Sequence, residues 1–255
     1  MHYPIYFSMG ALAAQTTGSG NSFRQRELRF YAELFSNWVQ LGGTGATHTM
    51  HNTQVLRFLN ELITNSHARL TTKIRPPLYR LTRAGVFALT SHLTARSYLE
   101  ERSDGILVWY FLKSYSNQIT ENMQRAGSDF SRAHQIEMEQ ILDRERFIQR
   151  QLQLVRHEMQ RLKGRISSAV DIDRDVRKLI KSGHSLQQCI DHVSTHYPYE
   201  LNPQQSFKAT LERLPLAVCE WEITEGSTLR ARHLFEALLD DLTLYAKRLE
   251  TLVTL

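Results

Sequence analysis

The sequence predicts a mainly α-helical protein with two parts: an N-terminal domain made of a helix, a basic hairpin and a second helix, and a C-terminal bundle of long helices. Two observations lead to this prediction. Between Thr49 and Leu93 the spacing of apolar residues changes from about 3.6 to about 2 and back. From Met138 to Ala169 apolar residues recur at alternating steps of three and four. We therefore expect a flexible segment at 1–22, a domain at 23–103 and a helical region at 104–255.

The N-terminal domain is predicted to start with a helix at 23–41, which packs in the core through a face of Leu28, Tyr31, Leu34, Phe35 and Trp38. Its next helix is predicted to begin at Asn52 or Thr53, which are good capping residues. Its apolar positions recur at three- and four-residue steps; they are Val55, Leu56, Leu59, Leu62 and Ile63. The other face is polar and carries Thr53, Gln54, Arg57, Asn60 and Glu61. Side chains of these types form hydrogen bonds with base edges when the start of a helix enters a DNA major groove.

Two strands are predicted to follow, at residues 69–74 and 78–81, because their residues alternate in polarity. The turn between them contains Pro76 and Pro77, which cannot donate hydrogen bonds to a sheet, so we expect an exposed tip beside Lys73 and Arg75. Thr82 is placed to cap a second helix. Helix, hairpin and helix in this order are the arrangement of a winged helix.

The hairpin residues also carry a family resemblance. The run Arg75-Pro76-Pro77-Leu78-Tyr79-Arg80-Leu81-Thr82-Arg83-Ala84-Gly85 resembles the wing and following helix of bacterial PadR- and MarR-type winged-helix transcription regulators, in which R-P-x-x-Y-x-L-T-x-x-G is frequent. Val55-Leu56-Arg57-Phe58-Leu59-Asn60-Glu61-Leu62 resembles their recognition helix. The resemblance implies DNA binding by a dimer that is held together by C-terminal helices. In this chain the C-terminal helical region is far longer than in those regulators.

The charge distribution agrees with a nucleic-acid partner. Up to Ser103 the chain has eleven Lys or Arg and five acidic residues, which gives +6, and the remainder of the chain sums to −1. An excess of positive charge in one domain suits the phosphate backbone of DNA, although an ordinary solvated surface would also account for it. The predicted DNA-binding residues are Thr53, Gln54, Arg57 and Asn60 on the helix, and Lys73, Arg75 and Arg80 on the hairpin.

The heptad pattern predicts a coiled coil at about 138–169, with Glu145 as the one polar position in the seam. The predicted dimerisation residues are Ile141, Ile148, Leu152, Val155, Met159 and Leu162. Packing of the helix on its own chain is the alternative, and pairing within the chain or between subunits are both open. A dimer would fix the spacing of two DNA half-sites. The seven apolar residues Ile106 to Leu112 are predicted to be buried.

Motifs for catalysis or cofactors are missing: the chain has no Gly-x-Ser-x-Gly, no His-Glu-x-x-His, no phosphate loop and no dinucleotide fingerprint. Cys189, His192 and His196 share one helical face, as zinc ligands do, but no fourth ligand follows nearby. We expect a packed face with surface histidines there. The sequence thus predicts a protein that is not an enzyme and holds no metal or cofactor.

Two cysteines and no run of 18 apolar residues predict a cytoplasmic protein without a transmembrane helix or a disulfide framework. The predicted function is that of a homodimeric transcription regulator that binds double-stranded DNA. The alternative is a winged-helix adaptor that docks on protein, through its C-terminal helices, in a chromosome-organising or similar assembly. The charge distribution favours the regulator, and the large helical region favours the adaptor.

Overall fold

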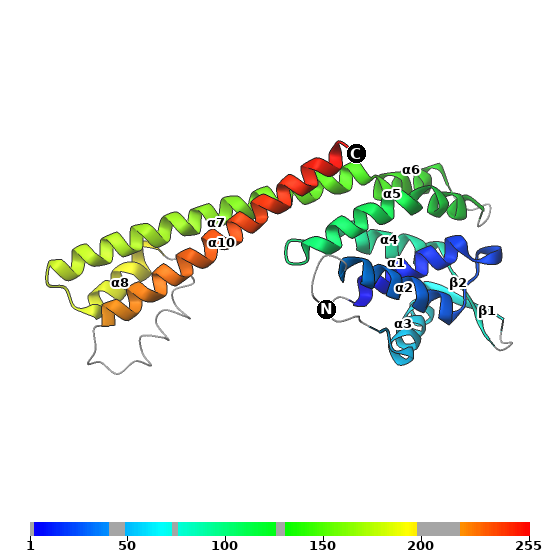
Figure 1. The fold of residues 1–255 in the computed structure, drawn as a ribbon, viewed down its shortest axis with the longest axis horizontal. Helices are drawn as coiled ribbons and strands as arrows, with labels where there is room; N and C mark the ends of the chain where they lie inside the picture. The colour runs from blue at the N-terminus through cyan, green and yellow to red at the C-terminus, as the bar shows by residue number, and fades with distance from the viewer. Residues whose placement is uncertain (1–2, 41–48, 73–75, 126–130, 198–219) are drawn as a thin grey trace. The chain divides into compact units, whose positions relative to one another are not determined.

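The computed structural model describes residues 3–40, 49–72, 76–125, 131–197 and 220–255 (Figure 1). The described chain is mainly helical and has a small sheet of two antiparallel strands. It divides into two compact units, Met1–Gln151 with Leu255, and Leu152–Thr254. The predicted boundary at residue 103 was therefore wrong. The helix that follows it packs on the helices before it, and so belongs to the N-terminal unit.

The N-terminal unit contains α1 (Tyr3–Thr17), η1 (Ser19–Asn21), α2 (Gln25–Gln40), α3 (Asn52–Thr64), β1 (Ala68–Thr72), β2 (Leu78–Leu81), α4 (Arg83–Ala95), α5 (Arg102–Arg125), α6 (Arg132–Leu142) and the start of α7 (Arg144–Lys181). The predicted order of helix, hairpin and helix between 49 and 93 is confirmed as α3, β1, β2 and α4. The boundaries agree to within one or two residues in the described part.

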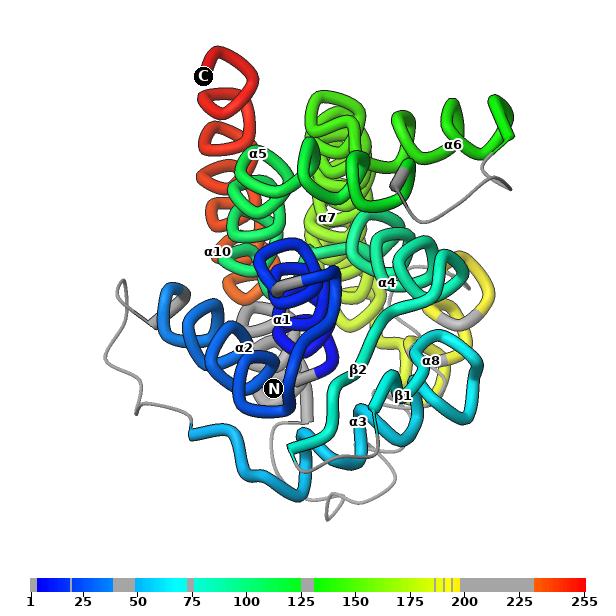
Figure 2. The backbone as a smooth tube through the Cα atoms, turned by 90° about the vertical axis from the view of Figure 1, so that its right-hand side faces the viewer, coloured from blue at the N-terminus to red at the C-terminus, as the bar shows by residue number. Residues whose placement is uncertain are grey.

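Helix α1 forms the centre of this unit, where it packs against α2, α4 and α5 (Figure 2). Its side chains are buried on all sides, among them Ile5, Met9 and Leu12. The expectation of a flexible segment at 1–22 was therefore wrong for residues 3–17. A helix that is apolar all round has no polar face to turn to water and must be covered by other elements. Gly10 allows close packing, since an added Cβ would lie 2.9 Å from the backbone nitrogen of Ala32 in α2.

The apolar run from Ile106 to Leu112 lies in α5 and is mostly buried, as predicted; only Tyr110 is exposed. Trp109 is fully covered, with the Lys113 ammonium 5.1 Å and the Arg144 guanidinium 5.9 Å from its ring centroid. The run is thus core of the N-terminal unit.

Strands β1 and β2 pair with Ala68 opposite Leu81, Arg69 opposite Arg80 and Leu70 opposite Tyr79. Phe23, between α1 and α2, makes an isolated antiparallel bridge to Tyr79, with two backbone hydrogen bonds of 2.8 Å. This bridge ties the start of α2 to the edge of the hairpin.

The junction from hairpin to α4 explains the Thr82-Arg83-Ala84-Gly85 sequence. The Thr82 hydroxyl accepts a hydrogen bond from the Gly85 amide at 3.0 Å and donates one to the Ser66 carbonyl at 2.8 Å. The predicted cap is therefore confirmed. Gly85 lies directly against the His67 carbonyl, which a Cβ at residue 85 would strike. Only glycine lets α4 start this close to the turn before β1.

The residues of the heptad pattern do not lie in one continuous helix from Met138, because α6 ends at Leu142 and α7 begins at Arg144, with Asp143 between them. The Asp143 carboxylate accepts hydrogen bonds from the amides of Glu145 at 2.8 Å and Arg146 at 3.2 Å. It thus satisfies donors at the start of α7 that have no partner within the helix. Asp143 therefore lies at the end of α6 and caps the start of α7, inside the heptad pattern.

The C-terminal unit contains the remainder of α7 together with α8 (Leu186–His196) and α10 (Glu220–Val253). Helices α7 and α10 run side by side in both views (Figures 1 and 2). They are antiparallel, since Arg156 pairs with Glu250 at 3.3 Å and the Arg165 guanidinium lies 5.5 Å from the Phe235 ring centroid.

The heptad seam is therefore covered within one chain. Leu152, Val155 and Leu162 are buried in the C-terminal unit, and Ile148 is buried in the N-terminal unit. These four residues are thus covered by their own chain, which is one of the two pairings that the heptad pattern left open. Ile141 and Met159 are half-buried. A heptad pattern predicts that a helix packs on another helix through apolar residues. It does not distinguish a helix of the same chain, such as α10, from a helix of a second subunit.

Candidate nucleic-acid interface

Helix α3 turns a polar face outward, as predicted. Val55, Leu59 and Leu62 are buried, whereas Thr53, Arg57 and Asn60 are exposed. Leu56 and Ile63, which were expected on the buried face, are about two-fifths exposed and lie at its edge. A shallow hollow of about 490 Å³ runs along the outer face; its lining residues are Thr53, Leu56, Arg57, Asn60, Glu61, Thr64 and Asn65.

The charge on this face is balanced. The Arg57 guanidinium lies 3.1 Å from the Glu61 carboxylate one turn along the helix. Both side chains are more than half exposed, so water and salt weaken the pair. Arg57 can therefore exchange Glu61 for another acceptor at small cost. The face itself adds no net positive charge.

Gln54 has a different position from the one predicted. Its side chain is half-buried, and its oxygen accepts a hydrogen bond of 3.2 Å from the His51 amide at the start of α3. Gln54 thus stabilises the helix start, and its contact with a base stays a prediction. The N-cap residue is His51, not Asn52 or Thr53.

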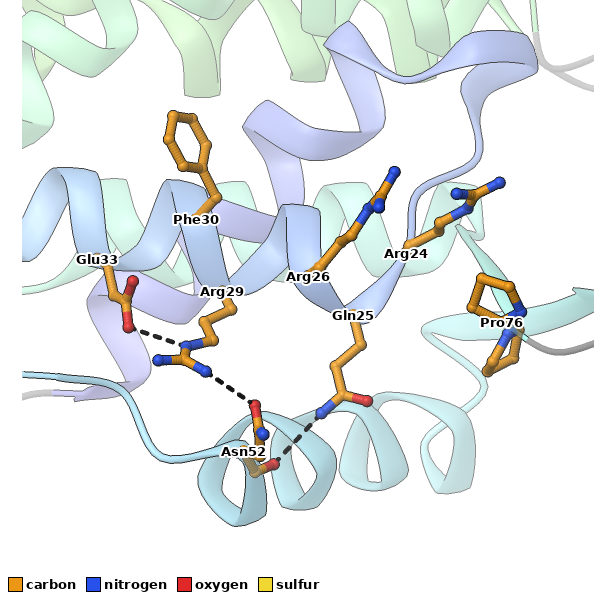
Figure 3. A pocket seen from close by; sticks show the side chains of 9 residues that line it. Arg24, Gln25, Arg26, Arg29, Phe30, Glu33, Asn52 and Pro76 are labelled. Atoms are coloured by element: carbon orange, nitrogen blue, oxygen red, sulfur yellow. Dashed lines mark hydrogen bonds and ion pairs between the residues drawn. The ribbon is translucent and has the colours of Figure 1, made fainter.

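Sequence reasoning missed a basic pocket at the start of α2. Figure 3 shows Arg24, Arg26 and Arg29 around a hollow of about 450 Å³ that also borders Asn52 and Pro76. Arg29 donates to Glu33 at 2.9 Å and to the Asn52 side chain at 3.2 Å, and so links α2 to the start of α3. The signal in the sequence was the closely spaced arginines at the start of the predicted helix. Their nearness to α3 and to the hairpin tip depends on the fold.

Two more arginines lie on the hairpin. Arg69 and Arg80 are directly opposite each other on β1 and β2, and Arg69 is exposed. Like charges in opposed positions destabilise a strand pair, so a bound anion would relieve the repulsion. In the part of the chain that the structure describes, the guanidinium groups of Arg24, Arg26, Arg69 and Arg80 have no carboxylate within 4.0 Å. The predicted contacts Lys73 and Arg75 lie outside the described residues.

The arrangement is thus a neutral polar helix face with arginines on the two neighbouring elements. Models of protein families, curated proteins and solved structures show no match to this chain. The functional argument therefore rests on the geometry of these residues.

On α8, Cys189 packs in a buried cluster, whereas His192 and His196 lie toward the surface. Cys189 is buried with Ile172, Val176 and Val193, and this burial raises the pKa of its thiol. The rings of His192 and His196 stack with centroids 4.0 Å apart. Among the described residues, no three His, Cys, Asp or Glu side chains are grouped to bind a metal ion. Nor does that part of the chain hold a helix with the length and apolar character to cross a membrane.

Proposed function

We propose that this protein is a transcription regulator that binds double-stranded DNA through a winged-helix domain, with α3 in the major groove. The observation that supports this most directly is the exposed polar face of α3 together with Arg24, Arg26, Arg69 and Arg80 on the two neighbouring elements, none of which pairs with a carboxylate of the described residues. Two of these arginines come from the start of α2 and two from the hairpin. Cationic flanks position a protein on phosphates, while the polar helix beside them contacts bases.

The order of elements supports the same proposal. Three helices followed by a two-stranded hairpin, α1, α2, α3, β1 and β2, is the order of a winged helix. Phe23, in the segment between α1 and α2, pairs with Tyr79 of β2 and so extends the two-stranded sheet by one residue. The proposed domain therefore includes α1, which the sequence had left outside it.

The proposed contacts fall into two classes. Thr53, Arg57 and Asn60 on the outer face of α3 contact base edges. Arg24, Arg26, Arg69 and Arg80 contact phosphates, together with Lys73 and Arg75 as the sequence predicts. Arg29 positions the start of α3 through Asn52.

A binding titration of labelled duplexes tests the proposal, using random-sequence DNA and DNA from upstream of the gene. Six phosphate contacts per copy predict a fall in affinity of about 1,000-fold between about 50 and 200 mM salt. A preference for one duplex at the higher salt would support sequence recognition. Affinity that does not change with salt, or no binding at about 50 mM salt, would contradict DNA binding.

The adaptor function remains the second candidate, because the C-terminal unit exposes apolar side chains. Leu234 is 58% and Leu238 is 36% exposed on α10, and exposed apolar side chains of this kind suit a protein partner. Absence of DNA binding at low salt, in a protein that melts cooperatively, would favour this candidate over the regulator.

A further inference from the structure

Helix α2 exposes aromatic side chains on the face that it turns away from the core. Its inner face buries Leu28, Ala32 and Phe35. On the outer face Phe30 is 60% and Trp38 is 55% exposed, with half-buried Leu34 midway between them. An ordinary surface helix presents polar residues on that side. A row of large apolar side chains at steps of four is instead typical of a helix that another surface covers.

A hollow lies beside one end of this row. It has a volume of about 400 Å³ and is formed where α1 ends and α2 begins; its lining residues are Ala14, Thr17, Gly18, Arg26, Glu27, Phe30 and Tyr31. Phe30 stands at its edge and is held by an edge-to-face contact with Tyr31, whose ring centroid is 5.3 Å away. Since a cavity of about 150 Å³ accommodates a benzene ring, this hollow has room for a large aromatic side chain.

The row is complementary to itself. Phe30 and Trp38 are both four residues from Leu34. A two-fold rotation about an axis through Leu34, perpendicular to α2, therefore places Trp38 of one copy at the level of Phe30 of the other. Arg26 and Glu27, at one end of this face, carry opposite charges, and the residues on the face between Glu27 and Trp38, namely Phe30, Tyr31, Leu34 and Asn37, carry none. Two copies of a basic domain can therefore meet here without bringing like charges together.

We propose that a second copy of this chain docks on α2, antiparallel and related by a two-fold axis at Leu34. Trp38 of each copy then packs on Phe30 of the other and enters the hollow beside it. An isologous contact requires one patch to carry both the projecting group and the space that receives it. The outer face of α2 carries both, which distinguishes a second copy from an unrelated partner.

This inference rests on the dimeric form of the proposed regulator and names its contact surface, since four of the six heptad residues, Ile148, Leu152, Val155 and Leu162, are buried within one chain. It also gives a spacing. The Gln25 side chain touches the Asn52 carbonyl at the start of α3, at 3.5 Å. Gln25 is nine residues from Leu34, so two copies would place these points about 27 Å apart along the paired helices. That is about 7 Å less than the half-site separation of about 34 Å on DNA.

The mass of the protein in solution tests the contact. We expect the wild type to have twice the chain mass of 29.6 kDa and Trp38→Glu to have the single-chain mass. The matched control is Leu244→Glu, because Leu244 is 52% exposed on α10 and lies outside the patch; it should remain dimeric. Both variants should melt like the wild type. A monomeric wild type, or a dimeric Trp38→Glu variant, would overturn the inference.

Cross-linking provides a second, independent test. In a chain with Cys219→Ser, Leu34→Cys should couple to itself through a short bis-maleimide, because a residue on a two-fold axis meets its own copy. Phe30→Cys and Trp38→Cys chains should couple in mixture more efficiently than either alone. Leu244→Cys is the control and should not couple. Failure of Leu34→Cys to couple in a dimeric protein would place the contact on another surface.

DNA binding separates the two proposals. If both are correct, monomeric Trp38→Glu still binds a single half-site with the salt dependence of the wild type, but loses about tenfold or more in affinity for two half-sites. If Trp38→Glu is monomeric and neither protein binds DNA, the contact surface stands and the proposed function fails.

Discussion

The Tyr6 hydroxyl donates a buried hydrogen bond of 2.9 Å to the Asp104 carboxylate, across the contact between α1 and α5. Burial raises the pKa of Asp104 from its ordinary 3.8 to about 6, and Glu101 adds to the rise. The hydrogen bond from Tyr6 and the charge of Arg96 act in the opposite direction. Burial also raises the pKa of Tyr6, which keeps the hydroxyl protonated as the donor. A titratable carboxyl thus lies in the core of the N-terminal unit.

This carboxyl should make stability depend on pH in the acidic range. The folded protein binds the Asp104 proton more tightly than the unfolded chain does. Its contribution to stability is therefore complete below pH 3.8 and is lost as the pH rises through about 6. We expect the free energy of unfolding of the wild type, relative to Asp104→Asn, to fall by about 1–3 kcal/mol between pH 4 and 7. Urea unfolding at a series of pH values measures this difference.

Tyr6→Phe is the control for that experiment. It removes the donor that stabilises the charged carboxylate, so it should destabilise the protein more at pH 7 than at pH 4. A difference between wild type and Asp104→Asn that stays constant with pH would show that Asp104 does not titrate in this range.

Arginine variants should separate base contacts from phosphate contacts. Arg57→Ala should cost about 1–3 kcal/mol on a preferred duplex and relax the sequence preference. Arg24→Ala or Arg80→Ala should weaken binding to every duplex and reduce the salt slope by about 1. Arg156→Ala on α7 is the charge-matched control and should leave binding unchanged. Equal losses on all duplexes from both kinds of variant would contradict this division.

Glu61→Gln tests the Arg57–Glu61 pair in the opposite direction. The substitution removes a negative charge from the outer face of α3 and releases the Arg57 guanidinium, which lies 3.1 Å from it. DNA affinity should therefore rise, by about 0.5–1 kcal/mol for an exposed pair. Titrations of both proteins at the same salt concentration measure the change. Weaker binding by Glu61→Gln would mean that Glu61 itself contacts a base.

Gly85→Ala should strongly destabilise the N-terminal unit, by about 2 kcal/mol or more, because the new Cβ meets the His67 carbonyl. Gly164→Ala is a matched control inside α7, where an added Cβ has nothing within 4 Å. It should stabilise the helix by about 0.5–1 kcal/mol. Thermal melting followed by circular dichroism compares the two. Similar melting temperatures for both variants would refute the close contact.

Cys189 should react slowly with alkylating reagents in the folded protein. Its thiol is buried and has a raised pKa, so little thiolate is present or accessible. We expect alkylation at Cys189 to be about tenfold or more slower in buffer than in urea, measured by peptide mass. Equal rates would mean that α8 does not pack on Ile172 and Val176 of α7 in solution.

The sequence predicted α3, the hairpin and α4 because local rules determine them. Amphipathic spacing, the Thr82 cap and the strand alternation all lie within a few residues of the positions that they affect. Helix α1 has no such signal: its residues are buried on every side, and its polar residues, such as Ser8 and Gln15, are buried with the apolar ones. No amphipathic period can be detected in a helix that has no solvent-facing polar side.

The candidate site was predictable to a similar extent. Thr53, Arg57 and Asn60 followed from the polar face of one helix. Gln54 did not, because a side chain three residues after a helix start can turn back to cap it. The pocket of Arg24, Arg26 and Arg29 required residues far apart in sequence to meet at Asn52 and Pro76. The heptad pattern predicted that this helix packs on another helix through an apolar face. It did not identify the partner, which is α10 of the same chain.

The position of α1 also determines how the chain must fold during synthesis. This apolar helix leaves the ribosome before α2, α4 and α5, and its hydrogen bond to Asp104 spans 98 residues. Contacts between such distant residues form slowly, and the exposed helix is prone to aggregation in the meantime. We therefore expect the yield of folded protein to depend on chaperones that hold the nascent chain. Fragments that start after α1 or end before α5 should accumulate as insoluble protein.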